Sequence, residues 1–182
     1  MLVTQNKSFF YDPTQGGLIV FFTIVIPSVG LTIWATSEAI SEKKILSQLI
    51  RFTIPVGFAS TLASLVVYFG FRHLTGDPIY EQLGVTYTIS LTGILMVLFI
   101  KPPSKFWMGD SPLRGDIRFI WMVLVMLILF GIVIMLPIAQ ELIKVAPLQQ
   151  IDHYFYILGA VLMWIVLTKL IWLLPGIKLS KV

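Results

Sequence analysis

The sequence predicts an all-α integral membrane protein, and three observations support this fold class. The chain of 182 residues is 57% hydrophobic and only 12% charged, whereas charged residues make up about 25% of a soluble domain. Several apolar stretches are long enough to cross a bilayer as helices, which takes about 20 residues each. Backbone polar groups must be satisfied inside lipid, so these stretches are expected to be helices rather than isolated strands. We expect one membrane domain over residues 1–182.

The first predicted span covers residues 17–35 and contains Pro27 near its middle. A proline inside a helix removes a backbone donor and clashes with the carbonyl one turn earlier, at a cost of about 3 kcal/mol. This predicts broken hydrogen bonding between Val25 and Val29, beside other spans. The second span covers residues 49–71, and Pro55 is expected in its first turns, where a proline costs little.

The third span, residues 84–100, contains several hydroxyl side chains, whereas the fourth, residues 117–136, contains none. The fifth span covers residues 154–174 and has Lys169 near its end. No predicted span carries Asp or Glu, which usually mark ion or proton paths in membranes. The histidines, His73 and His153, are expected at span borders in the membrane interface.

The basic residues predict the orientation of the five spans. Basic residues are enriched in cytoplasmic loops. One side of the predicted topology carries only Lys7, Arg72 and Lys144. The other side carries nine basic residues: Lys43, Lys44, Arg51, Lys101, Lys105, Arg114, Arg118, Lys178 and Lys181. The N-terminus is therefore predicted outside and the C-terminus in the cytoplasm of a multi-pass protein of the cell membrane.

The residues expected to line an ion path are Thr23, Pro27, Ser28, Thr88 and Thr92. A turn distorted by Pro27 would free carbonyl oxygens near Thr23, and such carbonyls ligate cations in several transporters. A simple kink at Pro27 is an equal alternative. For the hydroxyls, including Thr86 and Ser90, the alternative is helix packing or hydrogen bonding to the preceding turn.

The sequence lacks the patterns of a catalytic protein. It contains no Cys, no phosphate-binding glycine loop and no catalytic triad pattern. The net charge of +4 is small for a nucleic-acid partner, and none is expected. We expect no cofactor or firm metal site in this chain and no hydrolysis of ATP by the chain alone.

Three stretches resemble the C-terminal membrane half of cation-transporting P-type ATPases. The stretch "LIVFFTIVIPSVGLTIWAT" is similar to the sixth transmembrane helix of that family, with its Thr-x-x-x-Pro core at Thr23 and Pro27. "LIRFTIPVGFAS" is similar to the start of the seventh helix in the bacterial E-like branch. "FGIVIMLPIAQELIKVAPLQQIDHYFYILGAVLMWIVLTKLIW" resembles the ninth and tenth helices with the loop between them. Five spans with an outside N-terminus match helices six to ten.

The resemblance implies a membrane transport module that moves a cation across the bilayer. ATP and Mg²⁺ are then expected only in cytoplasmic domains outside this chain, and the N-terminal half of the pump is expected as a covalent or separate partner. Calcium and sodium-potassium pumps carry an Asp directly after the threonine of this core, where this chain has Ile24. The chain would be a fragment, a split-gene subunit or a decayed gene product.

Two other functions remain open at this stage. A non-enzymatic membrane scaffold or accessory subunit would use the same hydroxyls for packing. An independent passive channel is the weaker alternative, because the spans lack acidic rings and carbonyl-rich filters.

Overall fold

The computed structural model describes residues 13–34, 42–99 and 117–173. This part of the chain is helical and contains no strand, so the predicted all-α class is confirmed for it. Four helices are long and apolar enough to cross a membrane: Pro13–Ile33, Phe52–Leu74, Ile117–Met135 and Ile151–Ile171. They coincide with four of the five predicted spans.

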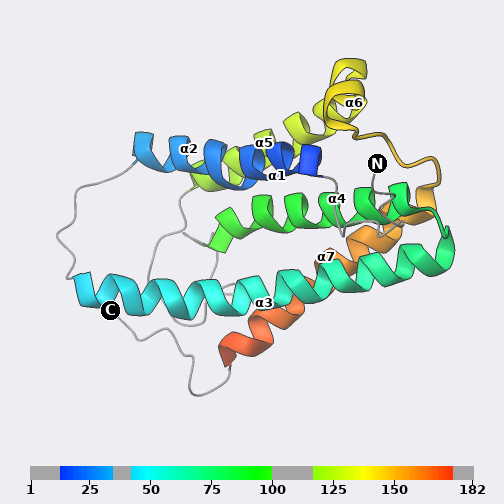
Figure 1. The fold of residues 1–182 in the computed structure, drawn as a ribbon. Helices are drawn as coiled ribbons and strands as arrows, with labels where there is room; N and C mark the ends of the chain where they lie inside the picture. Colours follow the sequence, from blue (N-terminus) through cyan, green and yellow to red (C-terminus); the bar gives the residue numbers. More distant parts are fainter. Residues whose placement is uncertain (1–12, 35–41, 100–116, 174–182) are drawn as a thin grey trace, which may run out of the picture.

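The helices follow one another in the order shown in Figure 1. The first helical rod is composite and consists of η1 (Pro13–Gln15), α1 (Gly16–Val20), the π-helical segment η2 (Phe21–Val25) and α2 (Ile26–Trp34). After it come α3 (Glu42–Leu74), α4 (Pro78–Met96), the short 3-10 helix η3 (Val97–Phe99), α5 (Ile117–Met135), α6 (Pro137–Ile143) and α7 (Ile151–Leu173).

Helix α4 occupies the centre of the bundle. It packs against α1, η2, α3, α5 and α7, and Figure 1 shows it between the first rod and α3. Its 19 residues match a membrane crossing in length, but polar side chains keep it outside the set of strongly apolar helices. Most of these polar side chains are buried against its neighbours: Glu81, Thr86, Thr88, Ser90 and Thr92.

Helix α3 starts earlier than the sequence predicts. It begins at Glu42, so the polar stretch before residue 49 continues directly into the second span. Its 33 residues extend about 50 Å at 1.5 Å per residue, well beyond a hydrocarbon core of about 30 Å. Pro55 therefore lies inside the helix rather than at its entry, although it is in the first turn of the apolar span Phe52–Leu74, as the sequence predicts.

Helix α4 also starts earlier than predicted, at Pro78 rather than near residue 84. The Asp77 carboxylate caps it by accepting a hydrogen bond from the N–H of Ile79 at 2.9 Å, and a proline in the first turn costs nothing there. Gly76, in the left-handed region at φ 64°, makes the tight turn from α3. As a result Glu81, outside the predicted span, is a buried residue of α4.

Glycine allows α3 and α4 to approach closely at one point. A Cβ atom added to Gly84 would lie 2.9 Å from Cγ1 of Val67 and 3.4 Å from the ring of Phe71. Val67 and Phe71 are fully buried, so they have little room to move away. Gly84 thus fixes the distance between the two helices.

We predict that Gly84→Ala destabilises the protein by about 1–3 kcal/mol through overpacking. Gly57→Ala on α3 is the matched control, because an added Cβ meets nothing within 4 Å there; the better helix propensity of alanine should leave stability unchanged or raise it by up to about 1 kcal/mol. Unfolding in detergent by denaturant measures both. Equal effects of the two substitutions would contradict the close approach.

Candidate functional site

The first helical rod is distorted directly before Pro27. From Phe21 to Val25 the backbone is π-helical, and the N–H of Ile26 donates to the carbonyl of Phe21, five residues earlier. Single π-helical turns inside α-helices occur frequently at functional sites. Pro27 has no N–H, so a carbonyl in the turn that contains Thr23 receives no hydrogen bond from it.

This distortion lies one turn earlier than the predicted break between Val25 and Val29. From Ile26 onward the helix is regular α-helix, and it does not unwind. In the π-helical turn the N–H of Ile26 donates to the carbonyl five residues earlier instead of four. The helical turns before and after it keep their backbone hydrogen bonds. In lipid this costs less than several unpaired backbone groups.

The π-helical segment packs on α4 at the contact between Thr23 and Gly93. A Cβ atom added to Gly93 would overlap the Cβ and Cγ2 atoms of Thr23, so only glycine fits there. The Thr23 hydroxyl donates to the carbonyl of Ile19 at 2.7 Å. Its hydrogen is therefore used within its own helix, and its oxygen remains available only as an acceptor.

Ser90 is the site residue that the candidate set from the sequence left out. It is fully buried, and its Oγ atom has no hydrogen-bond partner among the described residues. It lies one turn from Gly93 and one turn from Thr86, both of which contact the first rod. Helical spacing therefore places Ser90 on the face of α4 that is turned toward the π-helical segment. Buried hydroxyls without partners are uncommon, so this oxygen is suited to a water molecule or a cation.

The other predicted path residues lie elsewhere. Thr88 and Thr92 are buried and donate to carbonyls of their own helix, those of Gly84 and Ile89, at 2.8 and 3.1 Å. Thr88 follows Gly84 by one turn, which places it toward α3 rather than toward the first rod. Ser28, on α2, is exposed. Helical spacing thus places Ser90 on the face of α4 that meets Thr23 at Gly93, and Thr88 on the face toward α3.

A buried glutamine joins three elements at one end of the bundle. The hydroxyl of Thr86 donates to Oε1 of Gln15 at 2.5 Å, and Nε2 of Gln15 donates to the carbonyl of Lys144 at 3.0 Å. Gln15 is 2% exposed. We call this arrangement of Gln15, Thr86 and the Lys144 carbonyl the Gln15 clamp. It connects the start of the first rod to α4 and to the segment after α6.

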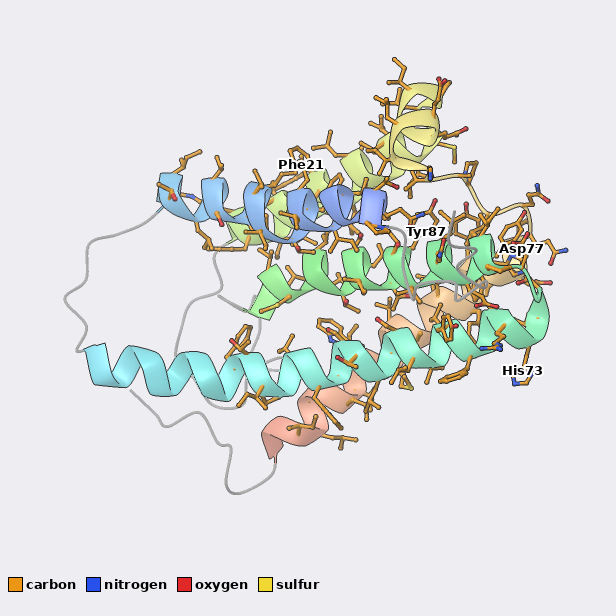
Figure 2. All side chains as sticks on the ribbon, viewed as in Figure 1. Phe21, His73, Asp77 and Tyr87 are labelled. Carbon is orange, nitrogen blue, oxygen red and sulfur yellow. The ribbon has the colours of Figure 1, made fainter. Side chains whose placement is uncertain are left out.

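Two tyrosines also bind the segment that follows α6. The hydroxyl of Tyr87 donates to the carbonyl of Ala146 at 2.5 Å, and the N–H of Leu148 donates to the Tyr154 hydroxyl at 2.8 Å. Figure 2 shows Tyr87 on α4 near this end of the molecule. The segment from residue 144 to residue 148 is therefore fixed over the ends of α4 and α7.

The two histidines differ in their surroundings. His73 is exposed, as expected for the interface. His153 is 5% exposed, and its ring centroid lies 5.0 Å from that of Phe71 and 5.7 Å from that of Tyr80. It packs among α3, α4 and α7 at the start of the apolar helix Ile151–Ile171, so it lies at a span border, as the sequence predicts, but it is covered by protein.

The chemistry of the site near Pro27 is that of neutral oxygen donors. A backbone carbonyl, the Thr23 hydroxyl and the Ser90 hydroxyl carry no formal charge. Within the described ranges, no group of three or more His, Asp or Glu side chains could hold a metal ion. Hard cations such as Mg²⁺ and Ca²⁺ are bound through carboxylates as well as neutral oxygens, so this site supplies only part of a coordination shell for them.

Comparison with protein-family models, with curated proteins and with solved structures finds no match to this chain. A function for this chain therefore has to be inferred from its residues and their geometry.

We predict that Gln15→Leu destabilises the end of the bundle that holds the segment 144–148. The substitution keeps the size of the side chain but removes both hydrogen bonds of Gln15, to the Thr86 hydroxyl and to the Lys144 carbonyl, at a cost of about 1–3 kcal/mol. Hydrogen exchange should show faster exchange in this segment. Gln149→Leu, at an exposed position, is the control and should leave exchange unchanged. Equal protection in both variants would rule out the clamp.

Proposed function

We propose that the chain is the membrane transport module of an ATP-driven cation pump of the P-type, with five membrane crossings in the cell membrane. The single observation that supports it best is the π-helical turn before Pro27, packed on Gly93 of α4 with the unpartnered Ser90 hydroxyl on the facing side. Freed carbonyls at bilayer depth are a common way for transporters to bind cations. The resemblance of the Thr23–Pro27 core to the sixth helix of these pumps agrees with it.

In this proposal α4 is the fifth crossing. It is less apolar than the other four helices, but its polar side chains are buried in the bundle and do not face lipid. Polar residues inside membrane proteins are tolerated where they face the protein interior. The distribution of basic residues then places the Gln15 clamp on the extracytoplasmic side and the start of α3 on the cytoplasmic side.

The transported cation would be held by neutral oxygens from this chain and by further groups from a partner. The partner is the N-terminal half of the pump, with the phosphorylation and nucleotide-binding domains to which ATP and Mg²⁺ belong. Ser28 and Thr32 support a partner on α2, because both are exposed in the described bundle. A second polypeptide segment packed there would cover these hydroxyls.

A membrane scaffold or accessory subunit is the second candidate. The observation that favours it is the hydrogen bonding of the hydroxyls, because Thr61, Ser64 and Thr88 each donate to the carbonyl four residues earlier in the same helix. Such bonds suit packing as well as transport. This function expects Pro27→Ala to raise stability without any loss of function.

We predict that Thr23→Val lowers cation transport about ten-fold, which corresponds to about 1.4 kcal/mol for one lost ligand. Valine keeps the contact with Gly93 but removes the acceptor oxygen. Thr61→Val is the matched control: its hydroxyl makes the same type of bond, to Gly57, but is exposed. The assay is ATP-driven cation uptake into vesicles from cells that co-express the partner half.

The partner half is sought in the coding sequence upstream of Met1 and elsewhere in the same genome. Absence of any coding sequence with a phosphorylation motif would overturn the proposed pump. Uptake that is equal in the wild type, Thr23→Val and Pro27→Ala would assign the chain to the scaffold function instead.

A further inference from the structure

We propose that α1 (Gly16–Val20) is a gate over the buried Ser90 hydroxyl and that Gln15 is the latch that keeps this gate closed. The gate rests on the proposed function, because it controls access to the same candidate site. The Gln15 clamp then does more than connect three elements of the bundle. It determines whether an ion can reach Ser90 from the end at which the first rod begins.

Two contacts define how the first rod lies along α4. Near the start of the rod the Thr86 hydroxyl donates to Gln15, and further along Thr23 lies against Gly93. The two elements therefore run in the same direction, as Figure 1 also shows. Ser90 is on the same face of α4, between Thr86 and Gly93. It therefore lies opposite the part of the rod between Gln15 and Thr23, which is α1 with the first residues of η2.

The Ser90 hydroxyl can take up an ion or a water molecule only after a neighbouring element moves. Ser90 has no exposed surface, and its Oγ atom has no hydrogen-bond partner among the described residues. On the side of the rod, Leu18 and Phe22 are buried in the same apolar cluster as Ile94, one turn from Ser90. These apolar side chains close the interface, so access to the hydroxyl requires the rod and α4 to separate locally.

Helix α1 is the neighbour of Ser90 that is best suited to open. It has five residues and buries one side chain, that of Leu18. It starts with Gly16 and Gly17, which disfavour the helical state, and it ends where the π-helical turn begins. Segments that open locally are those with few buried contacts. A short element between two glycines and a distorted turn meets this condition.

Gln15 holds the start of α1 through neutral hydrogen bonds. Its Oε1 atom accepts the Thr86 hydroxyl at 2.5 Å, and its Nε2 atom donates to the Lys144 carbonyl at 3.0 Å. The neighbouring Thr14 hydroxyl donates to the Ile143 carbonyl at 3.4 Å. Single neutral hydrogen bonds contribute little net stability, so this latch can be released and formed again. Its release lets α1 unwind away from α4.

The test uses the absence of cysteine from the chain. Ser90→Cys introduces a single thiol, and its rate of modification by a cationic, water-soluble methanethiosulfonate reagent is measured on the full chain in lipid nanodiscs. In the otherwise unchanged chain, modification should be slow because the gate is closed. Gln15→Leu should raise the rate about ten-fold or more, the equivalent of at least about 1.4 kcal/mol in the opening equilibrium.

Three further variants separate the gate from a general loosening of the bundle. Gln149→Leu, at an exposed position, should change the rate less than about two-fold, as for a surface substitution. A thiol at Thr88→Cys should stay slow to react with Gln15→Leu present, because Thr88 is fully buried on the α4 face toward α3. Gly17→Ala should slow modification at position 90 about four-fold, with or without Gln15→Leu, because alanine favours the helix and its Cβ atom meets nothing within 4 Å.

Three results would overturn the gate. They are fast modification of Ser90→Cys in the otherwise unchanged chain, an unchanged rate with Gln15→Leu, and equal acceleration of Ser90→Cys and Thr88→Cys by Gln15→Leu. The measurement needs neither ATP nor the partner half, so failure here is separate from failure of the proposed pump.

Discussion

The need to enclose the polar side chains of α4 governs the rest of the structure. A helix that carries a glutamate and several hydroxyl side chains cannot turn them toward lipid, because each unsatisfied polar group costs several kcal/mol there. In the bundle α4 is therefore surrounded by other helices, namely α1, η2, α3, α5 and α7. Glycines at positions 84 and 93 let α3 and the first rod come close enough to cover the polar residues between them.

The hydroxyls of α4 divide into three groups by the hydrogen-bond partner that each one uses. Thr88 and Thr92 bond to their own helix and leave the interface with α3 to packing. Thr86 instead reaches Gln15, so it ties α4 to the start of the first rod. Ser90 uses neither partner and stays unpaired beside the π-helical turn. A packing role accounts for the first two groups, but it leaves the buried Ser90 oxygen without an explanation.

Apolar length alone was enough to predict the positions of four helices, because lipid requires long apolar stretches. The same criterion misplaced the start of α4, since Glu81 and Gln82 lower the apolar character of its first turns while the fold buries Glu81. The Gln15 clamp could not be predicted, because Gln15 is separated from Thr86 by 71 positions and from Lys144 by 129. Pro27 predicted a distortion of the first rod. The position of that distortion could not be predicted, because it depends on how the neighbouring turns change their hydrogen bonds to compensate for the missing N–H of Pro27.

The position of Ile24 bears on how the proposed pump could hold a charged ion without a carboxylate there. Ile24 is 57% exposed, whereas its neighbour Thr23 lies against Gly93. A carboxylate at position 24, where the P-type pumps that the sequence resembles carry one, would therefore point away from α4 and toward whatever covers the first rod. In the proposed pump that place belongs to the partner half. Replacing the carboxylate by isoleucine removes a charge from that outer face only, and the inner face keeps its carbonyl, Thr23 and Ser90 oxygens. Charge compensation for the cation would then have to come from the partner.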